Sequence, residues 1–206
     1  MQSDYCYFLL DRLIWLDRRV EVRIRPVLPG LIRNPDAYRG RGDVEADYFH
    51  RDTARLSEML AMPYRYPDPS PVEFVAGSLW LAAEEQPRVK GLYQLFVAAT
   101  LAGRGLAWLD QVMRLIWDGR GVDWTTGAHL DDATRAAGLD PEELRAIAPM
   151  QIEAALQANH DAMAQAGHWG VPLMVVEGEP FYGQDRFDHV LWRLGLWQPA
   201  EGGIPR

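Results

Sequence analysis

The sequence predicts an α/β protein whose small sheet is assembled from both ends of the chain, with a block of helices between them. Three stretches predict this: a helix and strand in 3–27, a strand–turn–strand–helix unit in 170–194, and a largely helical region in 46–167. A parallel or mixed sheet with inserted helices is the economical solution for this order of elements. We therefore expect a split sheet domain, residues 1–45 and 168–206, and a helical insertion domain, residues 46–167.

Composition narrows the class of protein. The chain has 206 residues and a net charge of −8, which disfavours nucleic acid and anionic membranes as partners. The single cysteine, Cys6, excludes an intramolecular disulfide and a cysteine-rich metal site. The histidine spacing does not predict a metal site. No apolar run has transmembrane length and no secretory signal is evident, so we expect a cytoplasmic protein.

The first stretch predicts a helix over residues 3–17 and a strand over Val20–Val27. Helical spacing connects the apolar residues Cys6, Leu9, Leu10, Leu13 and Ile14. Ser3 or Asp4 would be the N-cap of this helix. In the strand, valine and isoleucine at 20, 22 and 24 alternate with charged residues at 21, 23 and 25.

The middle of the chain predicts several helices after an irregular, arginine-bearing loop at 28–45. The predicted helices are a helix with Leu56, Met59 and Leu60 on its apolar face, helices in Val72–Glu85 and in Pro87–Asp118 with a break near Gly103-Arg104-Gly105, one starting at Asp140-Pro141, and one over Met150–Ala166. The aromatic residues Trp80, Tyr93, Phe96, Trp108 and Trp117 are expected mostly in the core. Arg33, Arg39 and Arg41 could meet an acidic substrate, although solvated loop charges are commoner.

The last stretch predicts a hairpin and a helix. Leu173–Val176 is continuously apolar, as in a strand buried on both faces, and Glu177-Gly178 supplies the turn. Phe181-Tyr182 forms the return strand, and apolar residues at 187, 190, 191 and 194 form one face of the final helix.

Two sets of residues in this sequence resemble one known family. Gly170-Val171-Pro172 before a strand, followed by Phe181-Tyr182-Gly183-Gln184-Asp185-Arg186, resembles the end of the thioredoxin-like part of DsbA-like proteins. Ser3-Asp4-Tyr5 and Arg25-Pro26 resemble its beginning. The resemblance is greatest to kappa-class glutathione transferases and 2-hydroxychromene-2-carboxylate isomerases, and it covers both ends of the chain. It implies a thioredoxin-like (DsbA-like) sheet with a large helical insertion.

The resemblance also implies a glutathione site. Pro172 would be cis, Val171 would offer its backbone to the cysteinyl part of glutathione, and Gln184 and Asp185 would bind its γ-glutamyl end. Ser3 would hydrogen-bond the sulfur. Trp169 and Asn34 are candidates for the pocket wall. The plainer alternatives are a simple hairpin with Asp185 as an N-cap, and Ser3 as a helix cap only.

The sequence departs from the family in two ways. Asp4 stands where the family usually has proline, and a carboxylate beside a thiolate disfavours the anion. The family also has a strand before the serine, for which two residues leave no room, since they span only about 7 Å. Either the chain as given starts late, or the sheet has lost this strand and Val20–Val27 pairs elsewhere. In both cases we expect the sheet of this chain to lack the first strand, which would leave strand edges open.

The resemblance implies a glutathione-dependent isomerase of an aromatic catabolite of the hydroxychromene-carboxylate type. It would act on a small aromatic or electrophilic substrate, as a homodimer, without nucleic acid or membrane. One alternative is a kappa-like transferase that leaves glutathione attached to its substrate. Another is a truncated, non-catalytic DsbA-like protein, which Asp4 and the absent strand favour.

Overall fold

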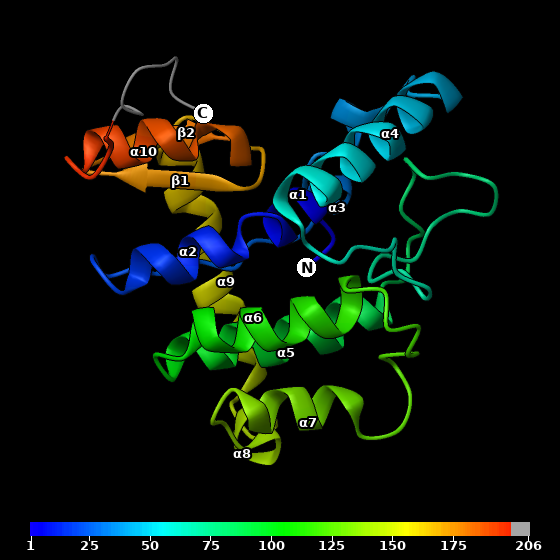
Figure 1. The fold of residues 1–206 in the computed structure, drawn as a ribbon. Coiled ribbons are helices and arrows are strands. Elements are labelled where there is room, and N and C mark those ends of the chain that lie inside the picture. The colour runs from blue at the N-terminus through cyan, green and yellow to red at the C-terminus, as the bar shows by residue number, and fades with distance from the viewer. Residues whose placement is uncertain (199–206) are drawn as a thin grey trace.

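A computed structural model of the chain describes residues 1–198. Its helices are α1 (Asp4–Tyr7), α2 (Leu10–Asp17), α3 (Gly30–Arg33), α4 (Asp43–Leu60), α5 (Pro87–Leu101), α6 (Gly105–Trp117), α7 (His129–Ala136), α8 (Pro141–Arg145), α9 (Pro149–Gln165) and α10 (Phe187–Arg193), with short 3₁₀ turns η1 (Pro35–Tyr38) and η2 (Gln184–Arg186). The strands are β1 (Leu173–Val176) and β2 (Glu179–Tyr182). Figure 1 shows the hairpin and α10 beside α2, with α5 and α6 on the other side of α2 and α7 and α8 beyond them.

The predicted first helix is divided into two. The Leu9 amide donates to the Cys6 carbonyl at 3.3 Å, three residues back, which tightens the chain at Phe8 and Leu9 before α2 begins. Ser3 occupies the N-cap position of α1, as predicted, but its side chain makes no capping hydrogen bond. Three predicted helix starts are confirmed. α8 begins at Asp140-Pro141, α6 begins at the break around 103–105, and α9 begins near Met150.

The predicted strand over Val20–Val27 is wrong as secondary structure, although its alternation is real. Val22 and Ile24 are half-buried, whereas Glu21, Arg23 and Arg25 are exposed. A strand needs a hydrogen-bonded neighbour. Within residues 1–198 this extended segment has none, because the sheet contains only β1 and β2.

The hairpin forms where the sequence predicts it. β1 and β2 are antiparallel, with Met174 opposite Phe181 and Val176 opposite Glu179. The two turn residues, Glu177 and Gly178, both have positive φ, 51° and 87°. Such a turn matches the twist of the two strands. The prediction that β1 is buried on both faces is wrong: all four of its residues are half-buried or exposed, and Val175 is 50% exposed.

Two further predictions in the middle of the chain are wrong. Val72–Glu85 is irregular, because Gly77 takes a positive φ and the Ser78 hydroxyl accepts hydrogen bonds from the amides of Trp80 and Leu81. Met59 does not share a buried face with Leu56, since it is 72% exposed.

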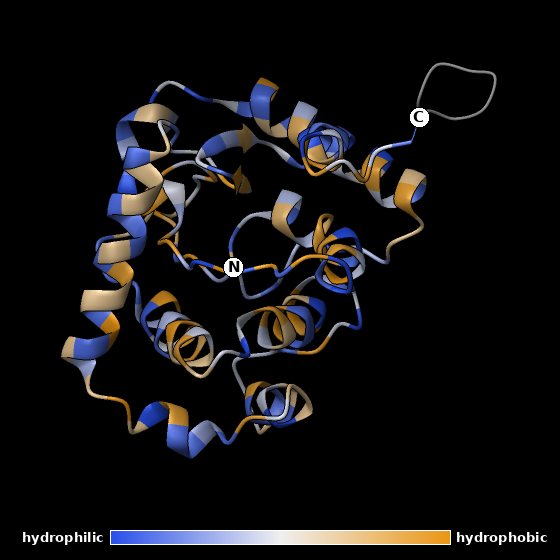
Figure 2. Cartoon of the chain, turned by 90° about the vertical axis from the view of Figure 1, so that its left-hand side faces the viewer, coloured by the Kyte–Doolittle hydropathy of each residue, from blue (hydrophilic) through white to orange (hydrophobic). Residues whose placement is uncertain are grey.

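The apolar side chains form two clusters. The larger joins α1 to the helical block and contains the buried aromatic residues Tyr93, Phe96, Trp108 and Trp117. The smaller contains Leu9, Leu16, Phe187 and Val190, and side chains of β1, β2 and residues 20–22 pack against it. Figure 2 shows the N-terminal residues in the middle of the view with helices around them. The two clusters meet at α1 and α2, so these helices position whatever lies between the ends of the chain.

Candidate functional site

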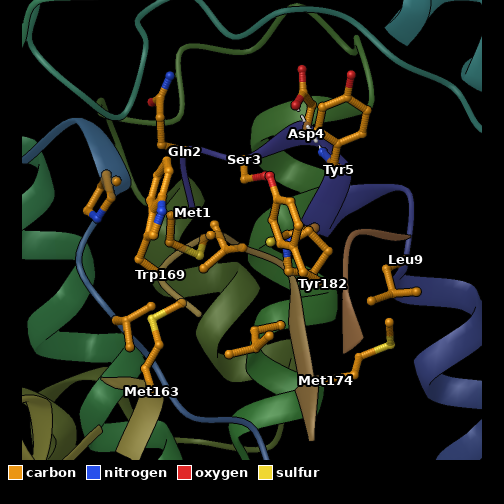
Figure 3. A pocket seen from close by; sticks show the side chains of 18 of the residues that line it. Met1, Gln2, Ser3, Asp4, Tyr5, Leu9, Met163, Trp169, Met174 and Tyr182 are labelled. Carbon is orange, nitrogen blue, oxygen red and sulfur yellow. Dashed lines mark hydrogen bonds between the residues drawn. The ribbon is translucent and has the colours of Figure 1, made fainter. Parts of the chain in front are cut away.

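One large cavity lies where the two ends of the chain meet. Its volume is about 1580 Å³, more than the roughly 300–1,000 Å³ of ordinary small-molecule sites. Part of it, here called the aromatic end, is lined by Ser3, Tyr38, Phe49, Trp80 and Trp169. Figure 3 shows Ser3 and Trp169 among the side chains that line the cavity. Another part, here called the strand end, is lined by Leu9, Leu13, Leu16, the extended segment 20–28, Met163 and β1. The predicted residues Ser3, Trp169, Val171 and Pro172 all line this cavity.

The backbone of Ser3 is hydrogen-bonded to α1, but its side-chain hydroxyl is not. Its carbonyl accepts hydrogen bonds from the amides of Cys6 and Tyr7 at 3.1 and 3.4 Å. The hydroxyl makes no capping hydrogen bond and lies near the Cys6 thiol, where it favours the thiolate form. Burial raises the pKa of that thiol in spite of this contact, so Cys6 is the inert, small apolar side chain that its place on the helix predicts.

Val171 and Pro172 are joined by a cis peptide bond, as the resemblance predicts. The Pro172 carbonyl accepts from the Gly183 amide at 3.0 Å, which continues the β1–β2 ladder by one pair. Within residues 1–198 neither the Val171 amide nor its carbonyl has a hydrogen-bonding partner. Val171 therefore presents an unpaired strand edge to the cavity that Ser3 also lines.

Gly170 allows Tyr182 to lie against the backbone just before this edge. A Cβ atom at residue 170 would clash with the Tyr182 ring and with His168, which stacks on that ring with centroids 4.0 Å apart. The Gly170 amide donates to His168 Nδ1 at 2.9 Å. Gly170 thus fixes the loop that carries Trp169 and Val171.

Asp4 lines the same cavity and is buried, with 2% of the residue exposed. Its carboxylate accepts hydrogen bonds from the Tyr5 amide at 2.9 Å and the Tyr64 hydroxyl at 3.2 Å. Burial outweighs these contacts and raises the pKa of Asp4 to about 7. Asp4 therefore carries only a partial negative charge at neutral pH, which weakens its opposition to a nearby thiolate.

Aromatic side chains surround the aromatic end. Tyr38 packs edge-on against Trp169 and parallel to Trp80, with centroids 6.2 and 6.4 Å apart. The Arg41 guanidinium lies over both Tyr38 and Trp80, at 4.9 and 5.1 Å from their ring centroids. Trp80 was expected in the core but is only half-buried and forms part of this wall. A cation held on an aromatic wall suits a flat, anionic ligand.

Arg33 connects this wall to the loop before β1. Its guanidinium donates to the Leu28 carbonyl at 2.6 Å and to the Trp169 carbonyl at 2.9 Å. Burial lowers the pKa of Arg33. Arg33 therefore holds the wall in place, whereas Arg41 is the arginine of this loop that offers charge to a ligand.

The remaining predicted residues do not line the cavity. Gln184 is buried, and Arg12 donates to both its side-chain and backbone oxygens. Asp185 is exposed and pairs with Arg186 at 3.0 Å. Asn34 lies between α3 and η1, where its amide donates to the Gly30 carbonyl at 2.8 Å. The structure thus brings together Ser3, Trp169, Val171 and Pro172. It leaves Gln184, Asp185 and Asn34 outside the cavity lining.

Sequence reasoning missed the partners of Asp4 and the aromatic wall as a unit. Tyr5 donates to Asp52 at 2.8 Å, and Tyr64 reaches Asp4 from 60 residues away. No local pattern connects such distant residues. One feature of the sequence indicates the aromatic wall: arginine and aromatic residues are concentrated between residues 33 and 50.

Among residues 1–198, no group of His, Cys, Asp or Glu side chains is arranged to hold a metal ion. In the same part of the chain, no helix has both the length and the hydropathy needed to cross a bilayer.

Comparisons with known proteins agree with this architecture. A solved structure of selenomethionine-labelled 2-hydroxychromene-2-carboxylate isomerase is similar, with a TM-score of 0.66 and 18% sequence identity over 94% of this chain and 90% of that chain. At this identity the likeness shows the fold alone. No curated protein matches the chain. The family described as the DSBA-like thioredoxin domain matches residues 1–195. The chain therefore belongs to the DSBA-like thioredoxin domain family.

Proposed function

We propose that the protein is a glutathione-dependent isomerase of a hydroxychromene-carboxylate-type aromatic acid. One observation carries the proposal: Ser3 and the unpaired backbone of Val171 line the same cavity as an aromatic wall that bears Arg41. A peptide-like thiol and a flat anionic substrate would thus meet in one enclosure. The similar solved structure is that of an isomerase, which agrees with this choice of reaction.

The residues at the cavity fit the thiol half of glutathione. The Val171 amide and carbonyl can pair with the cysteinyl backbone, as one strand edge pairs with another. The Ser3 hydroxyl, which no amide of α1 engages, can rotate from the Cys6 thiol and donate to the ligand sulfur. When bound, glutathione would supply a thiolate that adds to the unsaturated acid, permits rotation about the former double bond, and leaves again.

Asp4 determines how strongly that thiolate is opposed. A neutral Asp4 adds no repulsion, whereas an ionised one raises the pKa of a neighbouring thiol. Because the pKa of Asp4 is about 7, the opposition grows as the pH rises through neutrality. The Tyr5 amide already donates a hydrogen bond to the Asp4 carboxyl group and is not available to the sulfur. The Ser3 hydroxyl is therefore the main hydrogen-bond donor to the sulfur.

The γ-glutamyl end is the less supported half of the site. The resemblance assigns it to Gln184 and Asp185, but Arg12 already engages Gln184. The exposed Asp185 carboxylate remains for the ligand's ammonium, at the cost of its contact with Arg186. An exposed pair of this kind contributes at most about 1 kcal/mol, so this contact would refine the affinity for glutathione more than establish it.

Arg41 is the proposed partner of the substrate carboxylate, and Arg39 provides a matched control. Arg39 is exposed, pairs with Asp36 and does not line the cavity. Arg41→Gln should raise the KM for a hydroxychromene-carboxylate substrate about tenfold, because one charge-assisted contact is lost. Arg39→Gln should leave the KM unchanged. If both substitutions changed the KM equally, Arg41 would not be the partner of the substrate carboxylate.

The reaction class is tested by product analysis in the presence of stoichiometric glutathione. Isomerised acid with unchanged glutathione supports the proposal. Recovery of a thioether instead would make the protein a transferase that uses the same site. Isomerisation at the same rate without glutathione would contradict the proposed role of the thiol.

A further inference from the structure

Asp4 is a carboxyl group buried beside the proposed position of the glutathione sulfur. It follows Ser3 directly in the chain, and Figure 3 shows Ser3, Asp4 and Tyr5 in a row along one side of the cavity. Its two oxygens accept hydrogen bonds from the Tyr5 amide and the Tyr64 hydroxyl. Among residues 1–198, no arginine, lysine or histidine forms an ion pair with it. A buried carboxylate without a cation is costly, so such a group takes up a proton readily.

The titratable groups that face Asp4 are all acids. They are Tyr5 and Cys6 from α1, Asp52 from α4, and Tyr64 and Tyr66 from the segment that follows α4. An acid is neutral or negative, so none of these groups favours the ionised form of Asp4 by opposite charge. Burial has the largest effect and raises the pKa of Asp4 to about 7, even though the hydrogen bond from Tyr64 lowers it. Asp4 therefore changes its charge at neutral pH.

A glutathione thiolate held by Ser3 would put a second negative charge next to Asp4. Cys6 shows that the charge of Asp4 reaches a sulfur atom near Ser3: burial raises the pKa of the Cys6 thiol most, and the charge of Asp4 raises it further. Two acids this close in a buried site titrate as a pair, since the first ionisation opposes the second. At neutral pH the carboxyl group and the bound thiol therefore hold one negative charge and one proton between them.

We propose that Asp4 is the proton acceptor for the bound glutathione thiol, so that the thiolate forms without losing its proton to solvent. This role rests on the glutathione site proposed above. In the step, the S–H bond of glutathione breaks, its electron pair stays on the sulfur, and its proton bonds to a carboxylate oxygen of Asp4. The site carries one negative charge before and after the step. Asp4 keeps the proton while the thiolate adds to the unsaturated acid and leaves again, and releases it when glutathione dissociates.

Asp4 suits this role because its acidity is intermediate. A proton acceptor works best when its pKa is near the working pH, since it must be ionised before the thiol binds and neutral afterwards. Burial raises the pKa of Asp4 towards neutrality, and the hydrogen bond from Tyr64 keeps it from rising further. Once protonated, Asp4 no longer opposes the thiolate. An acid at the position where the related family usually has proline is thus compatible with activation of the thiol.

The test counts the protons released when reduced glutathione binds in the absence of substrate. Binding heats in two buffers of different ionisation enthalpy give this number, and near-ultraviolet absorbance of the same samples gives the amount of thiolate. At about pH 7.5 the unaltered protein should release fewer than about 0.3 protons per thiolate, because the ionised Asp4 takes up most of them. Asp4→Asn should release about 0.9, since the proton then has no acceptor in the site.

Two further variants assign the effect to Asp4. Asp52→Asn is the matched control, because Asp52 faces Asp4 and accepts a hydrogen bond from the Tyr5 hydroxyl at 2.8 Å, which the amide oxygen of asparagine can also accept. It should release as few protons as the unaltered protein. Tyr64→Phe removes a hydrogen bond that lowers the pKa of Asp4, so Asp4 is already more protonated before glutathione binds. Tyr64→Phe should therefore release more protons per thiolate at the same pH.

The unaltered protein tests the same role through pH alone, should Asp4→Asn not fold. Because Asp4 is protonated at low pH, thiolate formation there releases its proton to solvent. The apparent constant for thiolate formation should thus rise about eightfold between pH 5.5 and 6.5, but less than about twofold between pH 7 and 8. In Asp4→Asn it should still rise about eightfold between pH 7 and 8.

Two results overturn the proposal and differ in what they leave standing. Release of about one proton per thiolate by both the unaltered protein and Asp4→Asn at about pH 7.5, or an eightfold rise between pH 7 and 8 in both, would remove the role of Asp4 and leave the glutathione site intact. Absence of a thiolate signal from either folded protein would instead overturn the glutathione site, and the role of Asp4 with it.

Discussion

Asp4 is the residue at which burial most clearly changes the chemistry of this protein. The side chain makes two hydrogen bonds, yet only 2% of the residue is exposed. Hydrogen bonds from the Tyr5 amide and the Tyr64 hydroxyl favour the ionised form, whereas desolvation favours the neutral form and prevails. The identity of Asp4 alone predicts a carboxylate, and only the fold around it reverses this.

Asp4 makes stability depend on pH in a specific direction. Its pKa is 3.8 in an unfolded chain and about 7 in the folded protein, so the folded state binds more protons between these values. The stability contribution is therefore fully present below about pH 4 and falls as the pH rises to about 7. Asp4→Asn should remove this slope and stabilise the protein by roughly 2 to 4 kcal/mol at pH 8, since one unit of pKa is about 1.4 kcal/mol.

Urea unfolding at pH 4 and at pH 8 measures this effect. Asp36→Asn is the matched control, because Asp36 is exposed and its substitution should change stability by less than about 0.5 kcal/mol at either pH. A loss of stability in Asp4→Asn at pH 8 would mean that the ionised carboxylate is well compensated in its pocket.

At the scale of elements, the hairpin is encoded locally. Glu177 has a φ of 51° and Gly178 a φ of 87°, both in the left-handed region. Asparagine tolerates this region better than glutamate, so Glu177→Asn should raise the free energy of unfolding by about 0.5 kcal/mol. A lower or unchanged free energy in urea unfolding would mean that φ at residue 177 costs nothing.

The opposite change at the neighbouring residue separates backbone conformation from packing. A Cβ atom at residue 178 would meet nothing within 4 Å. Gly178→Ala should nevertheless lower the free energy of unfolding by about 1 kcal/mol, purely because alanine disfavours this φ.

The extended segment 20–27 shows where element prediction from sequence fails. Its alternation predicts the faces correctly, since Val22 and Ile24 are half-buried and Glu21, Arg23 and Arg25 are exposed. A strand also requires a neighbour, however, and the pattern within one segment contains no information about whether a neighbour exists. β1 is a second example of this failure. Its composition predicts burial on both faces, yet the strand is only partly covered.

At the scale of the whole molecule, the sequence predicts the site from the ends of the chain. Ser3 and Val171 are far apart in sequence, and the resemblance implies that both belong to one site. In the structure both residues line the same cavity. The aromatic wall was not predictable as a unit, because Trp80 reaches it only through the irregular stretch that replaces a predicted helix. Gln184 shows the converse case, in which a residue that fits a local pattern is already engaged by Arg12 from α2.

The central claim is that Ser3 and the Val171 edge hold the thiol of glutathione. The most direct measurement is a titration of reduced glutathione into the protein near pH 7, following thiolate absorbance in the near ultraviolet, with circular dichroism to verify folding. A Cys6→Ala background removes the protein's own thiol, and Ser3→Ala in that background tests the hydroxyl.

The account predicts saturable thiolate formation in the Cys6→Ala protein. It predicts that Ser3→Ala raises the pKa of the bound thiol by about one unit, because one hydrogen bond to the anion is lost. Absence of a thiolate signal in folded protein, or the same thiol pKa with and without Ser3, would contradict it.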